Sequence, residues 1–474
     1  MRTTRAGYEG RTSQNVARFE RIRYATAGRF EPPVAVPAAV PARTSSDAAD
    51  PQLPDEATAD TQLYAGTSAN MNVTLPNDRP VACPQRFSPV LSHLLRQSPE
   101  SLNQTENCQV LSIITPQDAE ATSSLPVMVW VHGGAYSTGA GSVPIYDPAL
   151  LVSEQNVIVV QVTYRLGVFG FLGHDSGVPA NLGLLDLTVA LEWVRSNIAA
   201  FGGDPDLVTL FGQSAGGDAI AHLMIAQGTT NLFRRAIIQS APVGISRHRR
   251  TVVTAARSIS RPPMEASVSE LVDHHSRIER AVSWRGFAGQ LPFGPEYGAA
   301  PLPSAAAREA AWRESAPRID VLIGHTTEET GLYLPLLPGL RRIRRHSVLG
   351  RLMRALLIVP TTYVVYGLPL RNFGRRLARA GGNVTRYRYR WASPASKTGP
   401  AHMSELVLLL GSVEAWAGTA FDCDTQEPES ERLGRLMRAH WATFARTGHV
   451  ASALTAESRD LIRFTKTRAG RVRS

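Results

Sequence analysis

The chain has 474 residues, of which 43% are hydrophobic and 19% charged, and its formal net charge is +10. This composition predicts a folded globular protein and excludes a low-complexity chain. Three cysteines are too few for a disulfide-rich scaffold. The positive charge comes from arginine, because Lys397 and Lys466 are the only lysines. Such a bias fits a GC-rich genome better than a nucleic-acid partner, so we expect no nucleic acid.

The amino-terminal region predicts short strands and turns over residues 1–37. Residues 38–80 are rich in Ala, Pro, Ser, Thr and Asp, which predicts an extra or flexible loop. The segment Met1–Arg5 leads to no apolar stretch of the kind found in secretory signals. We therefore expect a cytoplasmic protein.

The central region alternates strand-like and helix-like runs from about residue 105 to 245. This alternation is typical of an α/β fold, in which helices flank a large, mostly parallel central β-sheet. Residues 246–317 are variable in character. A closing amphipathic helix is predicted from Glu431 to Gly448.

Two glycine-containing motifs follow strand-like runs in this region. The run 127–131 leads into His132-Gly133-Gly134-Ala135-Tyr136, and the run 207–211 leads into Gly212-Gln213-Ser214-Ala215-Gly216. The second motif, placed between a strand and a helix, is typical of a nucleophile elbow. A serine on so sharp a turn projects its hydroxyl out of the sheet, and only small neighbours let the strand and helix approach. The first motif then predicts an oxyanion loop, which supplies backbone N–H groups beside that of Ala215.

A serine nucleophile also needs a base and an acid. Glu328 and Glu329 follow the strand-like run 321–326, and His402 lies in a loop before an apolar helical segment. The chain order Ser, Glu, His is the one expected of an elbow-bearing hydrolase. From the residues alone the two glutamates are not distinguished, and His222 and His325 are rivals of His402.

Several further blocks resemble the type-B carboxylesterases, the cholinesterase-like branch of the α/β-hydrolases, and among them the bacterial para-nitrobenzyl esterases. The resemblance covers nearly the whole chain, with matching blocks at 129–141, 181–205, 232–240, 324–329, 399–406 and 441–448. It implies the α/β-hydrolase fold with inserted helical cap regions. The chain would then form a single domain, 1–474, in which 246–317 is a shortened variable insertion.

Carried over by position, the resemblance implies that Ser214 is the nucleophile, Glu329 the acid and His402 the base. It implies an oxyanion hole built from Gly133, Gly134, Ala135 and Ala215. Two positions depart from the family pattern, which usually has glycine where this chain has Thr330 and Met403. Neither departure removes a catalytic group.

The implied activity is hydrolysis of neutral carboxylic esters through an acyl-enzyme, with a small-molecule ester as substrate and with no metal or organic cofactor. The alternatives are a hydrolase of amides, carbamates or thioesters with the same triad, and a non-catalytic cholinesterase-like scaffold. The oligomeric state, monomer or homodimer, stays open.

Two arginine-rich segments and one apolar segment could contact a membrane or a protein partner. The run 341–346 and the helically spaced set at 371–379 are rich in arginine, and either a solvated face or an anionic membrane surface or acidic partner would explain them. Pro360, Thr361, Thr362 and Gly367 interrupt the apolar run 356–370, so we expect no membrane span.

Cysteine positions add one further implication of the resemblance. Cys83 and Cys108 occupy positions similar to the ends of the first Ω-loop of the family. They would pair in an oxidising compartment and stay as thiols in a reducing one.

Overall fold

The fold is known from a computed structural model. It describes residues 2–467 apart from residues 6, 38–78, 88–91, 93, 174–176, 247–248, 261, 333–346 and 423–427. Most of the loop predicted at 38–80, the basic run 341–346 and Cys423 therefore lie outside the described residues.

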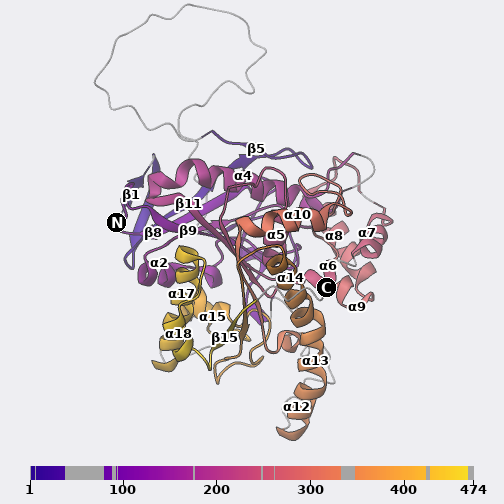
Figure 1. Cartoon of the computed structure of the whole chain (residues 1–474). Coiled ribbons are helices and arrows are strands. Elements are labelled where there is room, and N and C mark those ends of the chain that lie inside the picture. The colour runs from indigo at the N-terminus through magenta and orange to yellow at the C-terminus, as the bar shows by residue number, and fades with distance from the viewer. Residues whose placement is uncertain are drawn as a thin grey trace, which may run out of the picture.

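A large mixed β-sheet forms the centre of the molecule (Figure 1). The order of its strands is β1-β2-β3-β8-β10-β9-β11-β12-β13-β14-β15. Parallel pairing joins the six strands from β10 to β14, and antiparallel strands lie at both edges. The strands are β1 (Arg2–Arg5), β2 (Tyr8–Ser13), β3 (Val16–Arg23), β8 (Val110–Pro116), β9 (Leu125–Val131), β10 (Ile158–Val162), β11 (Gly203–Gln213), β12 (Arg235–Gln239), β13 (Asp320–Thr326), β14 (Val384–Tyr389) and β15 (Ile462–Lys466).

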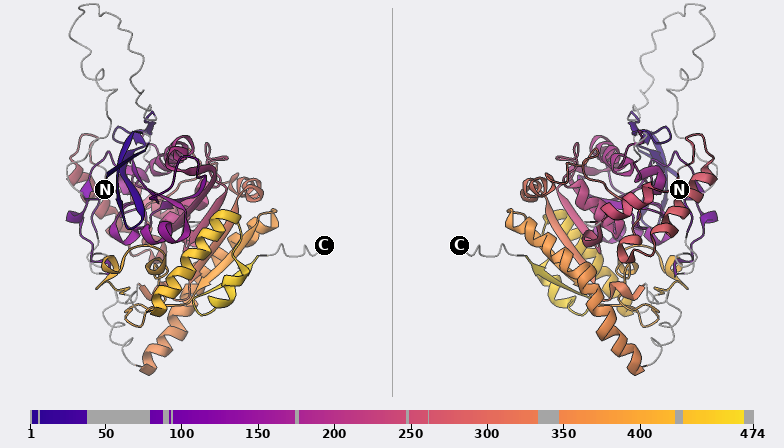
Figure 2. Two further views of the ribbon diagram at one scale, coloured as in Figure 1. Left: turned by 90° about the vertical axis from the view of Figure 1, so that its left-hand side faces the viewer. Right: turned by 90° about the vertical axis from the view of Figure 1, so that its right-hand side faces the viewer.

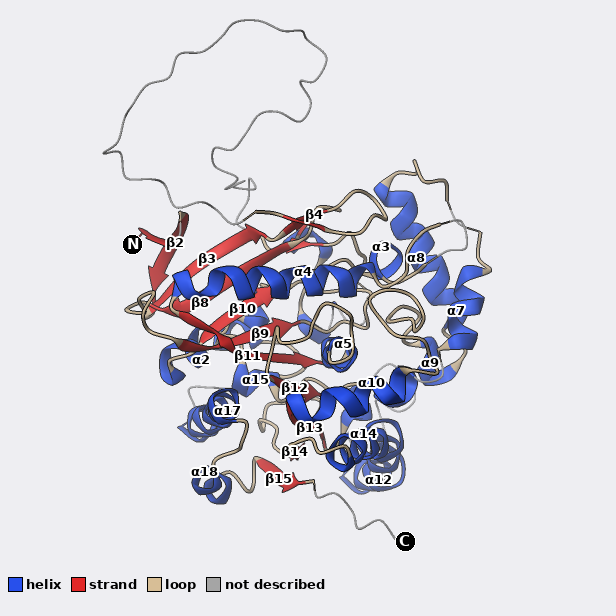
Figure 3. Cartoon of the chain, turned by 45° about the horizontal axis from the view of Figure 1, so that its top comes forward, coloured by secondary structure: helices blue, strands red, loops and turns tan. Residues whose placement is uncertain are grey.

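Helices cover both faces of this sheet (Figure 3). On one face lie α4 (Leu182–Asn197), α5 (Ala215–Leu223) and α14 (Leu368–Arg379), and on the other lie α2 (Ala149–Gln155) and α17 (Pro428–Thr447). The central strands are apolar on both sides because both sides are covered. Buried hydrophobic residues form two clusters. In β9, for example, Val129 belongs to the first cluster and Trp130 to the second.

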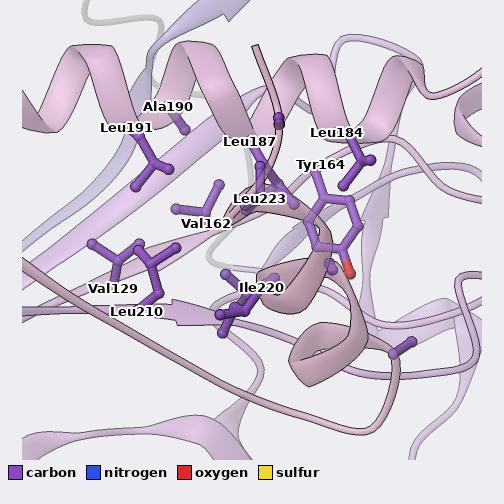
Figure 4. Packing of buried hydrophobic residues seen from close by; sticks show 14 of the residues in the cluster. Val129, Val162, Tyr164, Leu184, Leu187, Ala190, Leu191, Leu210, Ile220 and Leu223 are labelled. Atoms are coloured by element: carbon purple, nitrogen blue, oxygen red, sulfur yellow. The ribbon is translucent and has the colours of Figure 1, made fainter. Parts of the chain in front are cut away.

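The first of these clusters fills the space between the sheet and the helices α4 and α5 (Figure 4). Side chains from three parallel strands meet two helices there, which is the expected packing of an α/β layer. The residues labelled are Val129, Val162, Tyr164, Leu184, Leu187, Ala190, Leu191, Leu210, Ile220 and Leu223. The mostly parallel sheet with helices on both faces is the one that the alternating pattern predicts.

The carboxyl-terminal region differs from the prediction of a closing helix. The amphipathic helix exists as α17, but the chain continues through α18 (Ser452–Glu457) into β15. β15 pairs antiparallel with β14 and forms the edge of the sheet. Its sequence Ile-Arg-Phe-Thr-Lys places Phe464 among charged residues, and so short an edge strand gives little periodic signal.

The residues that interrupt the apolar run 356–370 do not end the helix that contains it. Val348–Arg379 is one continuous helix, made of α12 (Ser347–Met353), η7 (Arg354–Ile358), α13 (Val359–Thr362), η8 (Tyr363–Gly367) and α14. Both η7 and η8 are π-helical, and each ends two residues before a proline, Pro360 and Pro369. A proline conflicts with the carbonyl four residues earlier, and the wider π turn accommodates it without ending the helix. By length and composition alone, this helix is apolar enough to cross a membrane.

The variable region 246–317 carries four helices within its described residues. They are α7 (Arg250–Arg257), α8 (Val268–Val282), α9 (Gly286–Gly289) and α10 (Arg308–Ser315). The first, α7, packs against α8, and α10 packs against α14.

The two amino-terminal cysteines are both buried as thiols. Cys108 lies in side-chain contact with Cys83, and burial raises its pKa well above the usual value.

Candidate active site

Ser214 lies on a sharp turn between β11 and α5. Its backbone has φ 58° and ψ −124°, a conformation that L residues rarely adopt. A Cβ atom on Gly216 would lie 2.0 Å from the carbonyl oxygen of Val131, and one on Gly212 would lie 2.6 Å from the same atom. Only glycine fits at these two positions, which explains the small residues on both sides of the serine. Ser214 is partly exposed, whereas the residues next to it are buried.

The glycine loop after β9 lies directly against this turn. A Cβ on Gly133 would come within 3.2 Å of the Cβ of Ser214. The loop then turns through positive φ values of 107° at Gly134, 56° at Ala135 and 59° at Tyr136. Hydrogen bonds hold this shape, since the carbonyl of Gly134 accepts from two later backbone N–H groups and that of Tyr136 accepts from Gly167. The structure thus places the four predicted oxyanion residues in the two segments that meet at Ser214.

His402 and Glu329 come together although 73 residues separate them in the chain. Nδ1 of His402 lies 2.5 Å from Oε2 of Glu329, and both side chains are buried. A carboxylate at this distance holds the proton on Nδ1, which leaves Nε2 as the acceptor. Nε2 lies 3.0 Å from Nε2 of Gln213, the residue before Ser214. The ring therefore presents its accepting nitrogen at the elbow.

The Glu329 carboxylate has donors on its other oxygen. Oε1 accepts hydrogen bonds from the Ser240 hydroxyl at 2.6 Å and from the Thr326 backbone N–H at 2.7 Å. Burial raises the pKa of Glu329, but the charge and hydrogen bond of His402 outweigh burial and leave the pKa below its usual value. Glu329 is therefore held as a carboxylate.

Glu328 points away from His402. Its Oε1 pairs with the guanidinium of Arg354 at 2.7 Å, and Arg354 belongs to the long helix. Adjacent residues on a turn direct their side chains differently, so only one of the two glutamates reaches the histidine. The glutamate that contacts His402 is Glu329, the one that the family resemblance implies as the acid.

The two rival histidines have other partners. Nε2 of His222 lies 3.0 Å from the hydroxyl of Tyr297, and its Nδ1 lies 2.7 Å from the carbonyl of Asp218. His325 contacts the carbonyl of Thr326, and burial lowers its pKa. Neither is placed at Ser214 by these contacts.

The two departures from the family pattern have different structural consequences. The Thr330 hydroxyl faces the long helix, where it lies 2.8 Å from the hydroxyl of Thr361 and 3.1 Å from the carbonyl of Ile358. Met403 has φ 79°, in the left-handed region that glycine adopts without strain. Met403 therefore carries backbone strain next to His402.

Three residues of this site were not singled out from the sequence. The hydroxyl of Ser240 contacts the carboxyl groups of both Glu329 and Glu405. The ring of Tyr366 lies 5.5 Å from that of His402. Glu405 is buried, and burial followed by the charge of Glu329 raises its pKa to about 8. The position of Glu405, three residues after His402, is the one feature of the sequence that could have indicated its place in the site.

The chain is similar to known esterases and hydrolases in sequence and in structure. A model of the carboxylesterase family matches residues 4–348, a range that includes Ser214 and Glu329 and ends before His402. The probable N-octanoylanthranilate hydrolase AqdA2 of Rhodococcus erythropolis is 33% identical over 452 residues, which cover 94% of this chain and 92% of that protein. The para-nitrobenzyl esterase of Bacillus subtilis (strain 168) is 33% identical over 398 residues, 77% of this chain and 78% of that protein.

Solved structures extend the likeness to the fold. A thermophilic PNB esterase superimposes with a TM-score of 0.67 at 26% identity, over 97% of this chain and 95% of that one. The sheet, its helices and the sequence matches agree with the α/β-hydrolase fold. The chain belongs to the carboxylesterase family and is a carboxylic-ester hydrolase.

Proposed function

We propose that the chain hydrolyses carboxylic esters through an acyl-enzyme, with Ser214 as nucleophile, His402 as base and Glu329 as acid. The observation that carries this proposal is the pair of His402 with Glu329, in which Nε2 of His402 lies 3.0 Å from the side-chain nitrogen of Gln213 at the elbow. The strained backbone of Ser214 supports it, because such strain is found where a structure holds a functional group in place.

In the proposed reaction, Nε2 of His402 exchanges the Gln213 amide for the hydroxyl of Ser214. It takes the proton of this hydroxyl as the oxygen attacks the ester carbonyl, and the new imidazolium is stabilised by the Glu329 carboxylate. His402 then gives the proton to the leaving alcohol. Water attacks the acyl group in the second half, with His402 again as base, and Ser214 recovers its proton.

The negative charge on the carbonyl oxygen needs fixed donors. We assign these to the backbone N–H groups of Gly134, Ala135 and Ala215, with Gly133 as part of the same loop. Ala215 begins α5, where N–H groups have no intrahelical acceptor and the helix dipole favours negative charge. One such donor is worth roughly a hundredfold or more in kcat.

Single and double substitutions test the triad. Ser214→Ala and His402→Ala should each lower ester turnover by about 10³-fold or more, and the double variant should be little slower than either. The exposed substitutions Ser258→Ala and His449→Ala serve as matched controls and should leave the rate unchanged. Losses that add in the double variant would mean that the two residues do not act as one unit. Retention of a tenth of the activity by pure Ser214→Ala would exclude it as the nucleophile.

Amide hydrolysis is the second candidate. The relative that spans 94% of this chain is named as a probable hydrolase of N-octanoylanthranilate, an N-acyl compound. The same triad would cleave an amide if His402 protonated the leaving nitrogen. A comparison of N-octanoylanthranilate with an octanoyl ester of a neutral alcohol distinguishes the two. Higher kcat/KM for the ester supports the first proposal, and higher kcat/KM for the amide supports the second.

A further inference from the structure

The long helix Val348–Arg379 exposes an apolar face. Among its residues Leu356 is 69% exposed, Val348 67% and Val364 63%. The exposed large hydrophobic side chains recur at helical spacing, so that they form one stripe. We call this stripe the apolar ridge; it consists of Val348, Leu349, Leu352, Leu356, Leu357, Val359, Tyr363, Val364 and Leu368. No other described segment gathers so many exposed large hydrophobic residues.

The opposite face of the same helix attaches it to the body. Ile358, Thr362, Tyr366, Leu370 and Phe373 are buried, and they too follow helical spacing. The segment α14 packs against β13 and β14, whereas the α12 end of the helix projects away from the body (Figure 1). The two turned views agree on this projection (Figure 2). The apolar ridge is thus displayed on a protruding element.

All charges on this helix are positive. Its described residues include Arg351, Arg354, Arg371, Arg375, Arg376 and Arg379, and no aspartate or glutamate. They flank an uncharged stretch, 355–370. Arg375 and Arg379 are exposed, whereas Arg354 pairs with Glu328 and Arg376 with Glu309. An apolar stripe with exposed arginines beside it is the composition of a helix that binds a lipid surface.

We propose that the apolar ridge docks on the surface of an anionic phospholipid membrane. Leucine, valine and tyrosine side chains enter the boundary between headgroups and acyl chains, and arginines meet the lipid phosphates. The helix lies on the membrane and does not span it. The stretch 355–370 has 16 residues, about 24 Å of helix against a hydrocarbon core of ~30 Å. Its buried face is also occupied by the body of the protein.

Charge argues for a membrane over a second copy of the chain. A two-fold pairing of this helix would bring arginines of one copy against those of the other, with no acidic residue on either helix to neutralise them. Anionic headgroups neutralise them instead.

The same helix contacts the candidate active site from its buried face. Thr362 lies 3.3 Å from the backbone N–H of Thr330, the residue after Glu329, and Tyr366 lies against His402. Docking would hold the site near the lipid surface, where apolar esters are concentrated.

Vesicle flotation with the full chain tests the proposal. The probes are vesicles of phosphatidylcholine alone and equimolar vesicles of phosphatidylcholine and phosphatidylglycerol. Wild type should float with the mixed vesicles, less with phosphatidylcholine, and less as salt rises. Leu356→Glu/Val364→Glu should lower the partition coefficient by roughly tenfold or more. Arg375→Gln/Arg379→Gln should lower it by about fivefold per arginine, and only on anionic vesicles.

A matched control carries the same charge change elsewhere. Val34 is 67% exposed and Trp284 74% exposed, both outside the long helix. Val34→Glu/Trp284→Glu should float like wild type, and all variants should hydrolyse a water-soluble ester at the wild-type rate. A bimane label on Leu356→Cys, in a Cys423→Ser background, should shift to the blue on mixed vesicles. This label tests the ridge even if the acidic variant does not fold.

Three results would overturn the proposal. They are absence of wild-type flotation at low salt, equal flotation of Leu356→Glu/Val364→Glu and wild type, and an unshifted bimane spectrum on mixed vesicles. A wild-type dimer that Leu356→Glu/Val364→Glu converts to monomer, without vesicle binding, would assign the ridge to a second copy.

Discussion

Glu329 and Glu405 share one hydrogen-bond partner, the hydroxyl of Ser240. Its oxygen lies 2.6 Å from Oε1 of Glu329 and 3.4 Å from Oε1 of Glu405. Two buried carboxyl groups so close together do not both ionise easily. Glu329 is held as the anion by His402, and Glu405 is held protonated up to a pH of about 8.

Replacement of Glu405 by Gln should therefore stabilise the protein at neutral and alkaline pH. The pKa of Glu405 is about 8 in the folded state and near 4.5 in the unfolded chain, so the folded state binds more protons between these values. Its contribution to stability falls as pH rises through this window and is constant above it. We expect the advantage of Glu405→Gln to grow to roughly 2 kcal/mol or more. Urea unfolding at several pH values measures it, and a pH-independent difference would contradict the assignment.

The acidic pair provides a second prediction. Glu329→Gln should lower kcat by roughly a thousandfold or more, since Nδ1 of His402 loses its carboxylate. Glu328→Gln should lower it by less than about fivefold, because Glu328 pairs with the largely exposed Arg354. Each substitution serves as the control for the other. The reverse ranking would place the acid at residue 328.

Gln213 predicts a preference for neutral esters. Gln213 precedes Ser214 and contacts His402, and its amide is uncharged. This position therefore has no carboxylate that would attract a quaternary ammonium group. The neutral carbon isostere of butyrylcholine should have a higher kcat/KM than butyrylcholine itself. Gln213→Glu should move this ratio toward the choline ester, more so at low ionic strength. A wild-type preference for butyrylcholine would refute the prediction.

A buried ion pair supplies a prediction about stability. Asp186 is fully buried and accepts from the side chain of Arg165 at 2.7 Å and 2.9 Å, and from its backbone N–H at 3.0 Å. Asp186→Asn leaves the guanidinium without a counter-charge, which costs about 3–5 kcal/mol. Denaturant unfolding should show this loss. Asp206→Asn, at an exposed pair with Arg195, is the control and should leave the free energy of unfolding nearly unchanged.

Local motifs explain how much of the site was predictable. The elbow at Ser214 and the glycine loop at Gly133 are set by backbone sterics within a few residues, so their sequences indicate their shapes. His402 and Glu329 were placed by family resemblance, because no local rule brings residues 73 positions apart together. The mostly parallel sheet was predictable because strands buried on both faces are continuous apolar runs.

Other features depend on tertiary contacts or on backbone detail. The pairing of Ser240 with Glu329 and Glu405 arises where β12 and the loop of His402 meet, and no spacing indicates it. The sequence does not indicate one long helix, because a proline such as Pro360 disfavours helix and only the π turn before it accommodates the ring. The sequence gives little indication of β15, because it is a short edge strand.

The acyl-enzyme itself is the most direct test of the account. The protein is mixed with p-nitrophenyl butyrate, quenched in acid during turnover, digested and analysed by mass spectrometry, with Ser214→Ala treated in parallel. We predict a butyryl group on the peptide that contains Ser214, formed in the wild type and absent from Ser214→Ala. A butyryl group on another residue, in an amount that Ser214→Ala does not reduce, would contradict the proposed mechanism.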